Sequence, residues 1–108
     1  MKSAQMCIRD RADAVPVLPG VRRWAEMGLL SEGMYRNRMF AEPGVHAEST
    51  VDTAVQDILY DPQTSGGLLI AVAENQAQAL CEHLADVIPC AHIIGQVLPR
   101  RDAYVHLR

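Results

Sequence analysis

The segment formed by residues 61–69 (DPQTSGGLL) carries residue types that could bind a phosphate. A proline fixes one backbone angle, two small hydroxyl residues follow, and two glycines let backbone N–H groups approach a ligand without a Cβ in the way. Successive N–H groups in such a turn can form a concave nest for an anion. Because a Gly-Gly pair before a strand is also common in ordinary turns, the spacing alone leaves the turn interpretation open.

The candidate site residues of this 61–69 segment, as a loop next to a phosphate or substrate, are Asp61, Thr64, Ser65, Gly66 and Gly67. Asp61 either ligates a metal ion or a water molecule, or caps the turn beside Pro62. The hydroxyls of Thr64 and Ser65 either donate hydrogen bonds to a phosphate or satisfy the backbone of the loop.

Outside this segment the sequence lacks the groups that phosphoryl transfer requires. Metal ions and positive charge stabilise the strongly anionic transition state of that reaction. No carboxylates cluster at metal-site spacing, and the only lysine is Lys2. The cysteines and histidines are scattered without metal-ligand spacing: Cys7, Cys81, Cys90, His46, His83, His92 and His106. The sequence therefore assigns no catalytic residue and no metal ligand.

The composition is that of one small soluble domain of 108 residues. A formal net charge of −3 argues against a nucleic-acid partner, which a basic patch would mark. No apolar run approaches the ~20 residues of a membrane span, and the N-terminus lacks the hydrophobic core of a signal peptide. An odd number of cysteines without a pairing pattern is typical of a reduced, cytoplasmic protein.

Hydrophobic periodicity and turn residues predict an α+β domain, a small mixed or antiparallel sheet with helices packed on one face. Helices are expected over residues 20–29, from a cap at Ser49 or Thr50 to Pro62, and over residues 74–88. Strands are expected over residues 68–73, 91–98 and 103–107, and residues 99–102 are expected to be a hairpin connection. Residues 30–41 are expected to be a loop with a short element near residues 38–40. Residues 1–11 are expected to be a disordered segment outside the domain, which spans residues 12–108.

Residues 12–108 resemble the carboxyl-terminal domain of selenophosphate synthetases, the second half of a fold shared with aminoimidazole ribonucleotide synthetase. The 61–69 segment matches a signature of that family completely. Residues 15–20 (VPVLPG) and 94–97 (IGQV) resemble two further family segments. Residues 33–38 resemble the family's Gly-Gly-Thr-x-x-Asn loop, with Glu32 in place of the first glycine and Met34 in place of the threonine. Gly33 and Asn37 are therefore candidates for a second site loop.

The resemblance implies an enzyme that phosphorylates selenide with ATP and Mg²⁺, giving selenophosphate, AMP and phosphate, and that forms a homodimer. In that family most catalytic groups lie in the amino-terminal half: a glycine-rich arm with a cysteine or selenocysteine and a lysine, and aspartates that hold magnesium. This sequence does not contain them, so it is expected to be a fragment that is inactive alone. The alternatives are a non-catalytic module for anion binding or protein association, or part of another superfamily enzyme such as aminoimidazole ribonucleotide synthetase.

Overall fold

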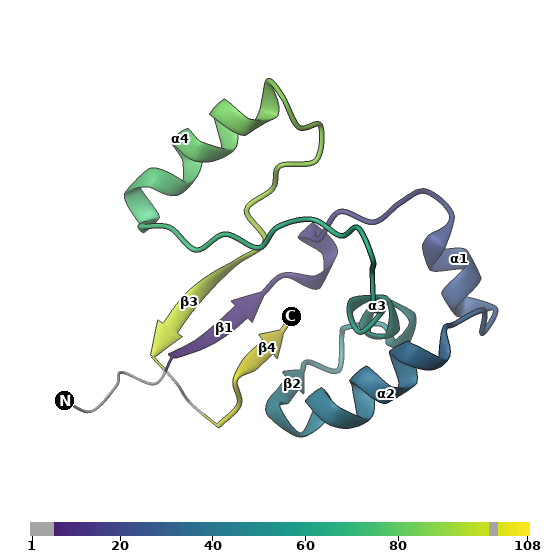
Figure 1. Cartoon of the computed structure of the whole chain (residues 1–108). Helices are drawn as coiled ribbons and strands as arrows, with labels where there is room; N and C mark the ends of the chain where they lie inside the picture. The colour runs from purple at the N-terminus through teal and green to yellow at the C-terminus, as the bar shows by residue number, and fades with distance from the viewer. Residues whose placement is uncertain (1–5, 100–101) are drawn as a thin grey trace.

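The computed structural model describes residues 6–99 and 102–108, and its centre is a four-stranded sheet with the order β2-β4-β1-β3 (Figure 1). The strands are β1 (Met6–Asp10), β2 (Val45–Ala47), β3 (Gly95–Pro99) and β4 (Val105–Leu107). β1 pairs antiparallel with β3 and parallel with β4, and β2 is parallel to β4. This mixed sheet, with separate helices, confirms the expected α+β class.

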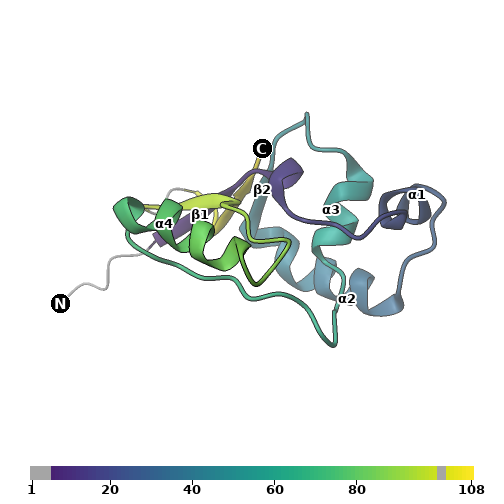
Figure 2. The same ribbon diagram turned by 90° about the horizontal axis from the view of Figure 1, so that it is seen from above.

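The helices form two groups on opposite sides of the sheet. They are α1 (Val21–Glu26), α2 (Glu32–Ala41), α3 (Thr53–Leu59) and α4 (Glu74–Ala85), with 3₁₀ turns η1 (Ala12–Ala14) and η2 (Glu42–Gly44). Figures 1 and 2 show α1, α2 and α3 gathered beyond the β2 edge, whereas α4 lies on the side of β3. α3 contacts both α1 and α2. The helices predicted over residues 20–29 and 74–88 are confirmed, with shorter bounds.

The hydrophobic core lies between α3 and one face of the sheet. Its members are the buried Ala12, Val51 and Leu107 and the partly buried Val45, Ala47, Val55, Leu59 and Val105. Residues 105 and 107 share one face of β4 because side chains alternate along a strand, and residues 55 and 59 lie one turn apart on α3. Burial of these side chains therefore holds α3 against β2 and β4.

The prediction of a loop over residues 30–41 is wrong, because α2 fills most of that range. Ser31 is the N-cap of this helix, and its hydroxyl accepts a hydrogen bond from the Met34 N–H at 3.2 Å. An ion pair between Glu32 and Arg36, one turn apart, supports the exposed face. Met34 is the only buried residue of the helix, so the sequence shows almost no apolar stripe there.

The helix predicted before Pro62 is present as α3, but its cap differs from the expected one. Asp52, rather than Ser49 or Thr50, is the N-cap, and its Oδ1 accepts a hydrogen bond from the Ala54 N–H at 2.8 Å. All three residues are good caps, so the choice depends on where the chain turns away from β2.

The prediction of a buried strand over residues 68–73 is also wrong. The chain runs from α3 to α4 without regular structure (Figure 1), and Leu68 is 90% exposed. Residues 62–72 pair with no strand that the structure describes, and residues 64–65 form a turn. A continuous apolar run suits a buried strand, but it does not by itself supply a neighbouring strand.

The amino-terminal segment is ordered where the structure describes it, contrary to the expectation of disorder over residues 1–11. Residues 6–10 form β1, which lies between β4 and β3, and Cys7 is 1% exposed. Residues 1–5 lie outside the described range. The strands predicted over residues 91–98 and 103–107 are confirmed as β3 and β4, with shorter bounds. They do not form the predicted hairpin, because β1 separates them.

Candidate functional site

The two candidate loops of the sequence lie against each other in the fold. The hydroxyl of Ser31, at the start of α2, donates to Oδ1 of Asp61 at 3.0 Å. Farther along α2, the side-chain amide of Asn37 donates to the carbonyl of Tyr60 at 2.9 Å. The candidate Asn37 therefore contacts the residue that precedes the 61–69 segment, although 23 positions separate the two in sequence.

Ser31 links the start of α2 to the 61–69 segment through both functions of its hydroxyl. The oxygen accepts from the Met34 N–H and so satisfies one of the unpaired donors of the first helical turn. The hydroxyl proton is directed at Asp61, whose negative charge lies near the positive end of the helix dipole. In this structure the carboxylate of Asp61 therefore has a structural role, because it accepts a hydrogen bond that joins the segment to α2.

Gly33 fits beside the proline of the segment because it has no side chain. A Cβ at position 33 would lie 2.6 Å from Cγ of Pro62, closer than real Cβ contacts come. In this structure Gly33 has a packing role, and the contact fixes Pro62 against α2.

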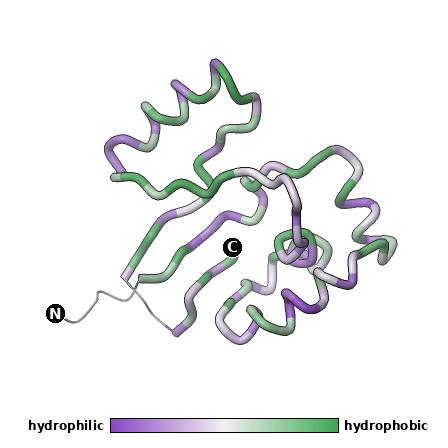
Figure 3. Tube along the Cα trace, in the orientation of Figure 1, coloured by the Kyte–Doolittle hydropathy of each residue, from purple (hydrophilic) through white to green (hydrophobic). Residues whose placement is uncertain are grey.

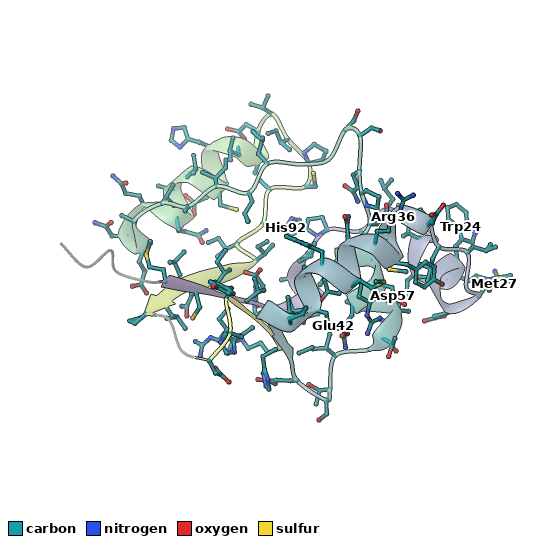
Figure 4. The ribbon with its side chains drawn as sticks, turned by 60° about the horizontal axis from the view of Figure 1, so that its bottom comes forward. Trp24, Met27, Arg36, Glu42, Asp57 and His92 are labelled. Atoms are coloured by element: carbon teal, nitrogen blue, oxygen red, sulfur yellow. The ribbon has the colours of Figure 1, made fainter. Side chains whose placement is uncertain are left out.

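Arg38 connects α2 to the end of α3. Its Nε donates to Oε1 of Glu42 at 3.1 Å, and its guanidinium forms an ion pair with Asp57. The carbon of the guanidinium lies 5.9 Å from the ring centroid of Tyr60, within the range of a cation–π contact. Figure 4 labels Glu42 and Asp57, the two carboxylates that flank this arginine. Asp57, at 9% exposure, is the buried acid of the described chain.

This network raises the pKa of two of its members. Burial opposes the charged form of Arg38, but hydrogen bonds to Glu42 and Asp57 outweigh it and raise the pKa of the guanidinium above its ordinary value. Burial, and then the negative charge of Glu42, raise the pKa of the Tyr60 phenol above its ordinary value. Arg38 is therefore charged and Tyr60 neutral at physiological pH.

The second half of the segment stands away from the protein. Residues 61–73 are all exposed, and the side chains of Thr64 and Ser65 make no hydrogen bond with the described residues. Gly66 and Gly67 are not among the positive-φ glycines of this structure, which are Gly20 and Gly28. The segment therefore lacks the alternating right- and left-handed backbone of one form of anion nest, and residues 64–65 form a turn instead.

The main cavities of the molecule lie elsewhere. A cavity of about 450 Å³ between β2 and α3 reaches Tyr60 but includes none of residues 61–69. Within residues 6–99 and 102–108, no group of three or more His, Cys, Asp or Glu side chains is placed to hold a metal ion. In the same ranges, no helix has the length and apolar character needed to cross a bilayer.

Sequence reasoning found the 61–69 segment, Gly33 and Asn37, but it missed Ser31 and Arg38. Ser31 had a usable signal, because a serine followed directly by a glutamate is typical of a helix start. Arg38 had none, because its partners come from η2 and α3.

No protein-family model matches the chain. It is 41% identical to the selenide, water dikinase of Clostridioides difficile over 106 residues, which cover 96% of this chain and 30% of that protein. The enzyme of the same name from Pelobacter propionicus is 46% identical over 92 residues, covering 84% of this chain and 26% of the relative. The one from Caldanaerobacter subterraneus is 35% identical over 107 residues, covering 98% of this chain and 31% of that protein. The chain thus spans less than a third of the length of these relatives, and by its sequence it belongs to the selenide, water dikinase family.

Proposed function

We propose that this chain is the carboxyl-terminal part of a selenide, water dikinase, which makes selenophosphate from selenide and ATP and releases AMP and phosphate. Residues 12–108 would be the carboxyl-terminal domain of that enzyme, and the 61–69 segment would border the phosphates of ATP. The observation that carries this proposal is the sequence similarity over nearly the whole chain to proteins with that name.

The geometry of the 61–69 segment supports a role beside an anion. Its base is held by α2, while the hydroxyls of Thr64 and Ser65 have no partner among the described residues. Gly67 has open space around its Cβ position, so its backbone can be approached from outside. Hydroxyl and backbone N–H donors of this kind bind phosphate oxygens.

The segment has donors for a phosphate but no group suited to catalysis. In the complete enzyme, Mg²⁺ would neutralise charge that develops on the ATP phosphates. The described residues do not fit that ion, because no carboxylate cluster is present and Oδ1 of Asp61 already accepts from Ser31. We therefore assign the metal ligands, the selenide site and the dimer contacts of this enzyme to the remainder of the polypeptide.

Exposed apolar side chains support the view that this chain is part of a larger protein. The apolar stretch on the connection between α3 and α4 (Figure 3) begins at Leu68, which is 90% exposed, and continues with Leu69 at 67%. Phe40 on α2 is 89% exposed and Val87 after α4 is 81% exposed. The radius of gyration is 15.0 Å, against the ~13 Å expected for a compact chain of about 100 residues. Soluble monomers rarely leave such surfaces uncovered.

The proposed location of this enzyme is the cytoplasm. Cys7, Cys81 and Cys90 are all free thiols in the structure. A reducing compartment maintains cysteines in this state.

Titration of the ¹⁵N-labelled chain with ATP, followed by NMR, tests the proposed function. We expect ATP at millimolar concentration to shift the amides of Thr64, Ser65, Gly66 and Gly67, whereas AMP, which lacks the outer phosphates, shifts them less. Equal or absent shifts with both nucleotides would contradict a phosphate-bordering role. A second measurement incubates the chain with selenide and ATP and follows ³¹P resonances. Formation of selenophosphate by this chain alone would show that it contains the catalytic groups after all.

A further inference from the structure

We propose that Ser31 and Asn37 of α2 are positioning residues for the 61–69 segment. They hold the base of the segment, residues 60–62, in one place. The tip of the segment, residues 64–67, then meets a phosphate in a defined position. The proposal rests on the function proposed above, because it names the residues that position that same site.

The two contacts of α2 act on consecutive residues of the connection. Tyr60 is the C-cap of α3, and its carbonyl is one of the acceptors that a helix leaves without an internal partner. Asn37 satisfies this carbonyl through its side-chain amide at 2.9 Å. Ser31 engages the next residue, Asp61, at 3.0 Å. Together they tie the end of one helix to the beginning of another.

The residues that make these contacts flank Met34 on α2. Ser31 and Asn37 lie three residues before and three residues after Met34, and a three-residue spacing makes side chains neighbours on a helix surface. Met34 is completely buried, at 0% exposure, and Arg38 pairs with Asp57 of α3. The face that contacts the segment is therefore itself fixed by packing.

The support ends abruptly within the segment. Pro62 lies against Gly33 of α2, and no side-chain hydrogen bond joins α2 to residues 62–73, all of which the structure describes. Residues 64–65 form a local turn, and the chain next enters regular structure at α4. A tip that moves about an anchored base loses less conformational freedom on binding than a wholly free loop, which favours affinity.

The test compares variants that remove one hydrogen bond with close variants that retain it. Asn37→Asp keeps the shape of the side chain but removes the donor to Tyr60, and Ser31→Ala removes the donor to Asp61. Ser31→Thr retains a hydroxyl with both functions. Asn75→Asp, on the exposed start of α4, makes the same change of chemistry away from the segment.

Two readouts are taken on the ¹⁵N-labelled chain: backbone order parameters of residues 60–67, and ATP-induced amide shifts. In Asn37→Asp and Ser31→Ala we expect the order parameters at Asp61 and Gln63 to fall from about 0.85 to below about 0.6. The ATP concentration for half-maximal shift should rise roughly three- to tenfold, which corresponds to the loss of one hydrogen bond. Ser31→Thr and Asn75→Asp should match the parent chain in both readouts.

The outcomes separate the positioning role from the proposed function and from a general loss of structure. Unchanged order parameters at Asp61 and Gln63 in both Asn37→Asp and Ser31→Ala would overturn the positioning role. If ATP shifts no amide in the parent chain, the phosphate-bordering function fails, while the order parameters still decide the positioning role. If Asn37→Asp unfolds by circular dichroism, the comparison of Ser31→Ala with Ser31→Thr decides. If Ser31→Ala and Ser31→Thr lost backbone order and ATP affinity equally, the effect would be one of general structure, which would contradict the proposal.

Discussion

Gly33 of α2 packs so closely on Pro62 that a Cβ at position 33 would lie 2.6 Å from Cγ of that proline. The two residues belong to the two candidate site loops of the sequence, and their contact joins α2 to the 61–69 segment. The absence of a side chain at Gly33 is therefore a requirement of tertiary packing.

Substitution Gly33→Ala tests this contact. Alanine is the better helix former by ~1 kcal/mol, but overlap with a rigid proline ring costs about 1–3 kcal/mol. We expect a net loss of about 1 kcal/mol in the free energy of unfolding, measured by urea denaturation. Gly67→Ala is the control, because nothing lies within 4 Å of its Cβ position, and it should change stability by less than ~0.5 kcal/mol. A more stable Gly33→Ala variant would show that Pro62 moves away without cost.

The ion pair between Arg38 and Asp57 should contribute far more to stability than the pairs on the surface of α2. Asp57→Ala leaves the partly buried guanidinium of Arg38 without its α3 partner, so we expect a loss of about 1–3 kcal/mol in the free energy of unfolding. Glu32→Ala removes an exposed pair with Arg36, in which the side chains are 83% and 73% exposed, and should cost less than ~1 kcal/mol. Equal costs for the two variants in urea denaturation would contradict the difference in burial.

The half-buried carboxyl of Asp10 should make stability depend on pH. Burial raises the pKa of Asp10 above 3.8, and its Oδ1 has no hydrogen-bond partner among the described residues. The contribution of Asp10 to stability is therefore fully present below pH 3.8 and is lost as the pH rises through the folded-state pKa. We expect Asp10→Asn to be more stable than the parent chain at pH 7, and the difference to shrink toward pH 3.8.

Chemical denaturation of both proteins between pH 3 and pH 8 measures this difference. Asp13→Asn, an exposed position in η1, is the matched control and should follow the parent chain. A constant difference between Asp10→Asn and the parent chain across this range would show that the charge of Asp10 carries no cost in the folded state.

The exposed apolar stretch that begins at Leu68 should cause self-association without contributing to stability. Leu68 is 90% exposed, so Leu68→Asp should change the free energy of unfolding by less than ~0.5 kcal/mol and reduce association in sedimentation velocity. Leu107→Ala, in the core, should instead cost about 2–5 kcal/mol. If Leu68→Asp destabilised the chain as much as Leu107→Ala, the stretch would be buried in solution.

Periodic apolar patterns predicted those elements in which the apolar residues themselves repeat with the period of a helix or a strand. α1, α4, β3 and β4 have apolar positions at helical or strand spacing, and the α+β class follows from them. The pattern fails for α2, because a single side chain, Met34, is buried there. It also fails for residues 68–73, since an apolar run does not show whether another strand is available to pair with it.

For the candidate site, the sequence alone determined the chemical character of the 61–69 segment: a proline, two hydroxyls and two glycines in an order shared with a known family. Only the tertiary structure decided what holds that segment. The partners of Asp61 and Tyr60 are Ser31 and Asn37, which lie 30 and 23 positions away. Hydrogen bonds across such separations depend on how α2 packs against α3, and that packing depends on side chains from several elements at once, which no local pattern encodes.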